Sequence, residues 1–368
     1  MEKVKLGEIF EYLPKSKFKA GDGKEKGKYK FFTSSNIQNK YIDEFVYDGE
    51  YIIFGTGGKA SINYCNNKFS TSTDNFVVKV NKAFCAKLIY LYFKNDMAKL
   101  EKGFKGASIK HISKEYINQL TIPKYNYEEQ LRIVNELDKV QKIIDIREKQ
   151  IEELDELIKS QFVELFGDIY YNKYKYNTKK LEDIAKVGSS HRVFTTDFVE
   201  KGIPFYRGKE IGQLANGVIP ENSYYISKEH YLKICDKDTK PKIGDLLIPS
   251  ICDKGQVWMV DTEEPFYYKD GRVLSISPKC EELNHKYFQY FMKLKTEIEY
   301  PKLGSGSTFA EFKIFILKNM EIVIPPIELQ NQFAEFLKLI DKQKFELQES
   351  LEEIEKLKES LMNKYFGE

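Results

Sequence analysis

The chain has 368 residues, of which 42% are hydrophobic and 14% aromatic, which is enough to fill the cores of two or three domains and excludes a disordered protein. Its 58 basic and 56 acidic residues leave a formal net charge of +2, so net charge alone neither indicates nor excludes nucleic-acid binding. The N-terminus lacks the apolar segment of a signal peptide and no run has the length of a membrane span, which predicts a cytoplasmic protein with no membrane contact.

Residues 1–125 alternate short β-branched and aromatic runs with Gly, Asn and Asp turns. Examples are YIIFG at 51–55 and NFVVKV at 75–80. An amphipathic helical pattern, AFCAKLIYLYFKNDM, follows at 83–97. Short strands combined with such a helix indicate a mixed β-sheet with helices, an α+β domain.

Residues 126–167 predict one long helix that ends in Phe166-Gly167, because glycine after a long periodic run is a typical helix stop. Apolar residues recur in this segment at alternating spacings of four and three, which is the pattern of a coiled-coil seam. The residues expected to pair with another helix are Ile133, Leu137, Val140, Ile144, Ile151, Leu154 and Ile158.

Residues 168–178 are polar, tyrosine-rich and aperiodic, so we interpret them as a linker. Residues 179–326 again read as an α+β domain, with strand-like runs such as DLLIP at 245–249 and a helical pattern at 284–298. The two globular segments repeat loosely. VKLGEIFEY from Val4 matches KKLEDIAKV from Lys179, an offset of 175 residues.

Residues 327–368 predict a second long helix, which repeats the first without a gap at an offset of 200 residues and ends in Phe366-Gly367. A helix of about 38 residues is about 57 Å long, more than the width of a domain of this size, so we expect the two helices to pair as an antiparallel coiled coil with pseudo-two-fold symmetry. Lys344 and Lys358 interrupt the seam, and such polar breaks can fix its register. The residues of this helix expected in the seam are Leu337, Ile340, Leu347, Leu351, Ile354 and Leu361.

The order of these segments resembles the specificity (S, or HsdS) subunits of Type I restriction-modification systems along essentially the whole chain. The matching stretches are FFTSSN at 31–36, IPFYRGKEI at 203–211, YYISKEHY at 224–231, GDLLI at 244–248, the Gly-Ser-Thr loop at 306–308, and the Ile-Pro openings of both long helices with their Glu and Gln residues. The resemblance implies that 1–125 and 179–326 are target recognition domains, each reading half of a split, asymmetric sequence in double-stranded DNA. It implies that the helices are spacers on which two methyltransferase subunits, and in some systems restriction subunits, assemble.

The chain carries no motif for catalysis of its own. The stretch Gly55-Thr56-Gly57-Gly58 fits neither G-x-G-x-x-G nor the phosphate-binding P-loop, and Pro325-Pro326 lies between isoleucines, unlike the motif of an amino-methyltransferase. The five cysteines and four histidines lack metal-binding spacings. We therefore expect a non-catalytic subunit without metal or cofactor, with S-adenosylmethionine bound by the partner methyltransferase and with methylation and cleavage in partner subunits.

Contacts with DNA require basic and hydroxyl or amide side chains on loops that can enter a groove or reach phosphates. Polar, glycine-containing loops meet this requirement in both globular segments. The predicted DNA-binding residues are Lys59, Lys68, Ser70, Thr71, Lys105, Ser108, Lys110, Ser190, Arg192, Arg207, Lys209, Lys254, Gln256, Arg272, Ser307 and Thr308.

Two other functions remain open at this point. The chain could serve a methylation-only or Type IIB-like system, which would differ in the genes beside it. It could also be a coiled-coil scaffold that joins two proteins without touching DNA. The scaffold predicts no salt-dependent binding to duplex DNA, whereas a recognition subunit predicts that affinity falls steeply with salt.

Overall fold

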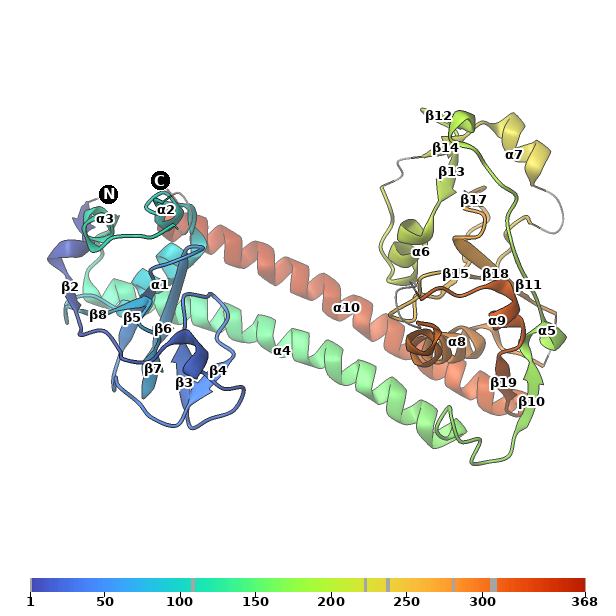
Figure 1. Cartoon of the computed structure of the whole chain (residues 1–368), viewed down its shortest axis with the longest axis horizontal. Helices are drawn as coiled ribbons and strands as arrows, with labels where there is room; N and C mark the ends of the chain where they lie inside the picture. Colours follow the sequence, from blue (N-terminus) through green and yellow to red (C-terminus); the bar gives the residue numbers. More distant parts are fainter. Residues whose placement is uncertain are drawn as a thin grey trace. The chain divides into compact units, whose positions relative to one another are not determined.

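A computed structural model describes residues 2–106, 110–221, 224–235, 239–279, 282–304 and 310–367. The chain divides into two compact units, the first comprising Met1–Gln150 with Leu347–Glu368 and the second comprising Ile151–Glu346. Two long helices, α4 (Tyr127–Phe166) and α10 (Ile327–Phe366), are drawn in Figure 1. Both are divided between the units, α4 after Gln150 and α10 after Glu346. Each unit is therefore α+β and contains part of both helices.

The described part of the first unit contains three sheets. The largest has the antiparallel order β2 (Phe10–Tyr12), β8 (Asn75–Val80), β5 (Tyr51–Gly55), β6 (Ser61–Cys65). A second has the order β4 (Lys40–Ile42), β3 (Tyr29–Phe32), β7 (Phe69–Thr71), in which β3 and β7 are parallel. Strands β1 (Lys3–Lys5) and β9 (Thr121–Pro123) form a third, and the helices are α1 (Ala86–Asn95), α2 (Ala98–Glu101) and α3 (Lys114–Gln119).

The second unit repeats this topology. Its main sheet has the order β11 (Ala185–Ser189), β18 (Val273–Pro278), β15 (Leu246–Pro249), β16 (Trp258–Met259), and its second sheet the order β12 (Phe198–Val199), β14 (Tyr225–Ile226), β13 (Ile203–Tyr206), β17 (Tyr267–Tyr268). Strands β13 and β17 are parallel, as β3 and β7 are. The remaining elements are strands β10 (Asn177–Lys180) and β19 (Glu321–Ile324), and helices α5 (Leu181–Ile184), α6 (Gly208–Ala215), α7 (Lys228–Ile234), α8 (His285–Glu299) and α9 (Ile314–Lys318). Compared with the described part of the first unit, β12, α6 and α7 are additions.

The long helices pair antiparallel, as the sequence predicts. In the first unit, Ile133 and Leu137 near the beginning of α4 share a hydrophobic core with Tyr365 and Phe366 at the end of α10. In the second unit, the residues at the end of α4 share a core with those near the beginning of α10: Ile158, Phe162 and Phe166 with Phe333, Leu337 and Ile340. The predicted seam residues lie on the covered side of each helix. Those that are buried are Ile133, Leu137, Val140, Ile144, Ile158, Leu337 and Ile340, and those that are half-buried are Ile151, Leu154, Leu347, Leu351, Ile354 and Leu361.

The ends of both long helices also pack into the hydrophobic cores of the units, a contact that the sequence did not predict. Phe366 lies in the core that α1 and the main sheet of the first unit also build, and its ring centroid is 5.6 Å from that of Tyr92. Phe166 makes the equivalent contact with Tyr287 of α8, at 4.8 Å. In each unit, apolar surface is thus covered by the end of a long helix that comes after the globular segment of the other unit in the sequence: α10 in the first unit and α4 in the second. This burial stabilises each unit through residues distant in the chain.

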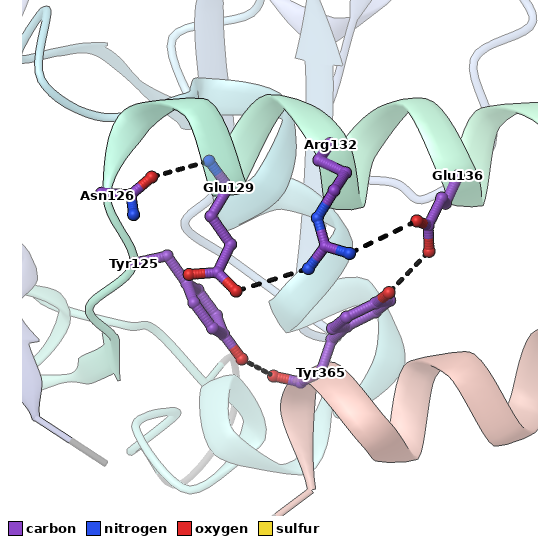
Figure 2. Close-up of polar contacts among 6 residues, drawn as sticks. All are labelled: Tyr125, Asn126, Glu129, Arg132, Glu136 and Tyr365. Carbon is purple, nitrogen blue, oxygen red and sulfur yellow. Dashed lines mark hydrogen bonds and ion pairs between the residues drawn. The ribbon is translucent and has the colours of Figure 1, made fainter.

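Polar contacts differ between the two helix pairings. At the first unit's end, the Tyr125 hydroxyl donates to the carbonyl of Tyr365 at 2.8 Å, and the Tyr365 hydroxyl donates to Glu136 at 2.5 Å (Figure 2). Arg132 bridges Glu129, at 3.4 Å, and Glu136, at 3.7 Å. The fixed 200-residue offset makes Leu329, Phe336 and Leu165 of the second unit equivalent to Glu129, Glu136 and Tyr365, and all three pack against the hydrophobic core there.

Lys344 and Lys358, the polar breaks in the predicted seam, make hydrogen bonds across the helix pair. In the second unit Lys344 Nζ lies 2.7 Å from Asp155 Oδ1, and in the first unit Lys358 Nζ lies 2.5 Å from Gln141 Oε1. A half-buried lysine needs such a partner, so a shift in register would leave each ammonium group unpaired. No helix in the described part of the chain has the length and apolar character required to cross a membrane.

The glutamines at the openings of both long helices are buried and anchor the preceding segments. Gln330 Nε2 donates to the carbonyls of Pro325 (2.8 Å) and Glu282 (2.9 Å), and its Oε1 accepts from Asn284 N at 2.9 Å. Gln130, at the equivalent position of the first unit, makes the same three kinds of bond, with Tyr125, Ala83 and Cys85. Each glutamine thereby fixes the segment that leads into α8 or α1 against the start of a long helix.

Candidate nucleic-acid interface

In the first unit, loops that are distant in sequence meet at one end of the main sheet. The turn between β5 and β6 is tied to residues 110–112, since Gly58 N donates to Lys110 O at 3.0 Å and Ile112 N donates to Thr56 O at 3.1 Å. Lys105 and His111 also exchange two backbone hydrogen bonds of 2.9 Å. We call residues 33–38, 56–60, 105–106 and 110–111 the first loop cluster. It brings together three predicted DNA-binding residues with exposed side chains, Lys59, Lys105 and Lys110.

The 33–38 part of this cluster was absent from the predicted DNA-binding residues. Asn36 fixes it to the β5–β6 hairpin, because Asn36 Nδ2 donates to Ala60 O at 3.0 Å and Ile62 N donates to Asn36 Oδ1 at 3.2 Å. Asn63 Nδ2 adds a bond to Ser35 O at 2.8 Å. The side chain of Ile37 at its tip is 71% exposed. The FFTSSN stretch, singled out for the family resemblance, was the available signal that this loop belongs to the site.

Two predicted contacts in the first unit are wrong. Ser70 and Thr71 lie in β7 with 0% exposure, and the Ser70 hydroxyl donates to Glu44 O at 2.9 Å. Buried hydroxyls cannot reach a groove, so these residues stabilise the domain. Lys68 is exposed but lies at the opposite end of β6 from Lys59, outside the first loop cluster, and it is 3.8 Å from Asp48.

In the second unit, an equivalent group of loops surrounds the end of β15. Ser250 N donates to Arg272 O at 2.9 Å, and Phe312 N donates to Ser250 O at 2.7 Å. The Ser189 hydroxyl donates to Val273 O at 2.8 Å and accepts from Gly271 N at 2.9 Å. We call residues 189–192, 206–209, 250–256, 269–272 and 310–312 the second loop cluster.

The second loop cluster differs from the first in its chemistry. Arg192 is exposed, with its guanidinium 5.1 Å from the Phe194 ring centroid, and Arg272 is exposed with its NH1 3.1 Å from Glu311. Lys209 and Lys254 are exposed as well. Gln256 is partly occupied within its own turn, since its Nε2 donates to Asp253 at 3.0 Å and its Oε1 accepts from Lys254 N at 3.1 Å.

Arg207 lies where β13 ends and α6 begins. Its side chain is 39% exposed and is hydrogen-bonded to Glu210, whose side chain is 4% exposed. The hydrogen bond to Glu210 raises the pKa of the Arg207 guanidinium, so this residue stays charged at every physiological pH. Its ring partner is Tyr224, 4.2 Å from the guanidinium carbon.

One predicted contact in the second unit is also wrong, and three lie outside the described residues. Ser190 is buried, and its hydroxyl donates to Tyr268 O at 2.5 Å, so it holds the second loop cluster in place. Ser108, Ser307 and Thr308 lie outside the described residues. Within the described ranges, no group of three or more His, Cys, Asp or Glu side chains is arranged to hold a metal ion.

The burial of Ser70 gives a testable prediction. Ser70→Ala removes one hydrogen bond from a buried hydroxyl and should lower the free energy of unfolding by about 1 kcal/mol. It should leave the affinity for duplex DNA and its salt dependence unchanged, because the side chain is covered by protein. Urea denaturation and gel shift over a salt series measure both quantities. A weaker salt dependence with unchanged stability would return Ser70 to the candidate DNA contacts.

These features define a class of protein: an α+β chain whose two units repeat one topology, each presenting a loop cluster with exposed basic residues, with two long helices that pair. The family model described as the Type I restriction modification DNA specificity domain matches residues 1–156 and 173–359, which is most of the chain. The chain therefore belongs to the family of Type I restriction-modification specificity subunits.

Individual relatives agree with this family. The Type I restriction enzyme MjaVIII specificity subunit of Methanocaldococcus jannaschii is 24% identical, over 98% of this chain and 91% of the relative. A putative MjaX specificity subunit from the same organism is 28% identical, over 72% of this chain and 65% of the relative. Among solved structures, the S subunit from M. genitalium has a TM-score of 0.64 at 15% identity, covering 100% of this chain and 96% of that one. A structure concerned with complex assembly of the type I system has a TM-score of 0.58 at 18% identity, covering 99% and 97%. These structural likenesses show the fold.

Proposed function

We propose that the chain reads a bipartite, asymmetric target in double-stranded DNA, with one loop cluster on each half of the target. The observation that carries this proposal is the contrast between equal topology and unequal loop chemistry. The predicted contacts that are exposed in the first loop cluster are all lysines, which act as point charges, whereas the second loop cluster combines lysines with Arg192, Arg207 and Arg272, whose planar forks suit bidentate recognition. Two units with the same topology but different loop clusters are suited to bind two different half-sites.

The lysines of the first loop cluster supply charge for phosphate contacts. Each phosphate that a lysine neutralises releases counterions and adds about 0.9 to the slope of log affinity against log salt concentration. Changing Lys59, Lys105 and Lys110 together to alanine should therefore reduce the magnitude of this slope by up to about 2.7. Gel shift with duplex DNA over a potassium chloride series measures the slope.

A matched control removes the same number of charges elsewhere in the first unit. Lys24, Lys99 and Lys124 lie outside the first loop cluster and form ion pairs with Asp43, Asp96 and Glu2. Their combined change to alanine should leave the slope close to that of the unaltered chain. Equal slopes for the two triple variants would show that the first loop cluster is not where this unit meets phosphates.

The long helices supply a surface for partner subunits. Both helices expose large apolar side chains at positions outside the seam, and a partner subunit that covered them would remove this apolar surface from water. The residues are Leu131, Ile143, Ile146, Leu157 and Val163 on α4, and Leu339, Phe345 and Leu357 on α10, with exposed fractions between 43% and 63%. We assign this surface to two methyltransferase subunits, with restriction subunits added in complete systems. In this assignment the partners bind S-adenosylmethionine and carry out methylation and cleavage.

A methylome of the host tests the function as a whole. We expect a split DNA motif with two unlike halves, whose methylation disappears when the gene for this chain is deleted and returns on complementation. Methylation that persists unchanged after deletion would contradict the proposal. A neighbouring methyltransferase gene without a motor nuclease would favour the methylation-only or Type IIB-like alternative, and absence of salt-dependent duplex binding by the assembled complex would favour the scaffold.

A further inference from the structure

Arg207 of the second loop cluster is held in one orientation by a buried carboxylate. Its Nε lies 3.4 Å from Glu210 Oε2 and its NH2 lies 3.3 Å from Glu210 Oε1, so the two groups meet side by side. Glu210 also accepts from the backbone N of Arg207 at 2.9 Å, which caps the start of α6. Because Glu210 is 3% exposed, its position is set by the surrounding protein and it fixes the arginine in turn.

An aromatic ring fixes the plane of the same guanidinium. The Tyr224 ring centroid is 4.2 Å from the guanidinium carbon, a stacking distance. Tyr224 is itself anchored, since its ring lies 4.9 Å from that of Phe198, which packs against the buried Phe205 at 5.2 Å. Glu210 therefore fixes the direction of the Arg207 guanidinium within its own plane, and the Tyr224 ring fixes the tilt of that plane. The other two arginines of the second loop cluster are held less firmly. Arg192 lies against the ring of Phe194, which is itself 57% exposed, and Arg272 is hydrogen-bonded to Glu311 through NH1 alone.

The contact with Glu210 leaves one edge of the fork available. A guanidinium has five N–H groups, and Glu210 uses the Nε–H and one N–H of NH2. Glu210 does not use the two N–H groups of NH1 or the second N–H of NH2, and one donor from each of these nitrogens can point the same way from the end of the side chain. Two parallel donors at this spacing match the O6 and N7 acceptors of guanine in the major groove.

Charge decides between a base and a phosphate as the target of this edge. Burial acts to raise the pKa of Glu210, but the hydrogen bonds to this carboxylate and the positive charge of Arg207 together lower it, so the carboxylate is ionised beside the cation. The pair therefore has no net charge. A neutral pair attracts a phosphate weakly, whereas its oriented donors remain fully effective toward the neutral edge of a base.

We propose that Arg207 reads a guanine in the half-site bound by the second unit, and that Glu210 and Tyr224 are positioning residues that hold its fork for this purpose. The inference rests on the proposed function of DNA recognition. The position of Arg207 in the fold supports this proposal. The next residue, Gly208, lies so close to Pro249 and to the Arg272 carbonyl that an added Cβ would contact both. Arg207 therefore lies beside the other loops of the second loop cluster.

The test is selection from a library of random duplexes by the full chain assembled with its methyltransferase, followed by sequencing. We expect the unaltered complex to enrich a split motif with guanine at one position of one half. Arg207→Lys keeps the charge but loses the fork, and should reduce the preference for that guanine by about tenfold to a hundredfold. Tyr224→Ala should reduce it in the same direction, with every other position unchanged.

Glu210→Gln separates base reading from phosphate binding and from a purely structural role. It unmasks the positive charge of Arg207, so it should weaken the guanine preference while increasing the salt slope of duplex binding by about 1. Asp183→Asn is the matched control. Asp183 accepts from the backbone N of Lys180 at 3.3 Å and caps α5 in the same unit, without a guanidinium beside it, so its variant should keep both the preference and the slope.

The outcomes are distinguishable. If the unaltered complex enriches no motif, the proposed DNA recognition fails. If it enriches a motif but Arg207→Lys and Glu210→Gln keep every base preference, the guanine assignment is overturned and Arg207 is a structural or phosphate-binding residue. Thermal unfolding of each variant identifies any that fail to fold. If a variant fails to fold, Tyr224→Phe, which keeps the stacked ring, is compared with Arg207→Lys. A guanine preference that is kept in Tyr224→Phe and lost in Arg207→Lys supports the assignment, whereas a guanine preference kept in both variants refutes it.

Discussion

Replacing Phe366 with alanine is expected to lower the free energy of unfolding of the first unit by about 3–5 kcal/mol, the usual cost of removing a buried phenylalanine. Phe366 is the last residue of α10 and is 5% exposed. It lies in the core that α1 and the main sheet of the first unit build, with its ring against Tyr92. The cavity would therefore open in a unit whose globular part ends more than 200 residues earlier in the sequence.

Hydrogen exchange measured by mass spectrometry in increasing urea checks this result unit by unit. We expect Phe366→Ala to reduce the protection of β5 and β8, while β15 and β18 of the second unit keep theirs. Phe345→Ala is the control, because Phe345 is on the same helix but 58% exposed, and its loss should change stability by about 0.5 kcal/mol or less. Loss of protection in the second unit alone would contradict the assignment of the α10 end to the first core.

Gln330→Leu is expected to lower the free energy of unfolding of the second unit by about 3 kcal/mol, because buried backbone groups that lose a hydrogen-bond partner are costly. The substitution keeps the volume of the side chain but leaves Asn284 N and the carbonyls of Glu282 and Pro325 without the amide. Gln130→Leu should have the same effect on the first unit, since Gln130 bonds Cys85, Ala83 and Tyr125 in the same way.

Gln332→Leu provides the control for this pair. Gln332 is on the same helix as Gln330 but exposed, so its substitution should leave stability within about 0.5 kcal/mol of the unaltered chain. Urea unfolding followed by hydrogen exchange assigns each loss to a unit. Equal midpoints for Gln330→Leu and Gln332→Leu would mean that the three bonds of Gln330 contribute nothing, and would remove the physical reason given for the glutamine at the helix openings.

Much of the fold was predictable because its signals are local and periodic. The alternation of four and three in α4 and α10 needs only the positions of apolar residues, and the 200-residue offset identified the two helices as equivalent. The loosely matching stretches from Val4 and Lys179 also fall on equivalent strands, because β1 and β10 each pair antiparallel with the strand that precedes a long helix. Sequence pattern was sufficient here because a repeat constrains two segments at once.

The candidate site was less predictable, because exposure depends on what covers a residue. Ser70, Thr71 and Ser190 have the side chains of a DNA-reading loop, yet neighbouring strands and loops bury them. Residues 33–38 enter the first loop cluster through hydrogen bonds of Asn36 and Asn63 to partners about 25 residues away in the sequence. Composition gives no sign of such bonds.

The sequence by itself determined the α+β class, the duplication, the seam of the long helices and the family, since each follows from periodicity or from motifs in order. Only the tertiary structure showed which segments complete each hydrophobic core and which basic side chains are held in one orientation by their neighbours. Phe366 belongs to the first unit and Phe166 to the second, and Glu210 rather than solvent faces one edge of Arg207. These are contacts between residues brought together by folding, and hydrophobic burial and hydrogen bonding act on distance in space rather than on separation along the chain.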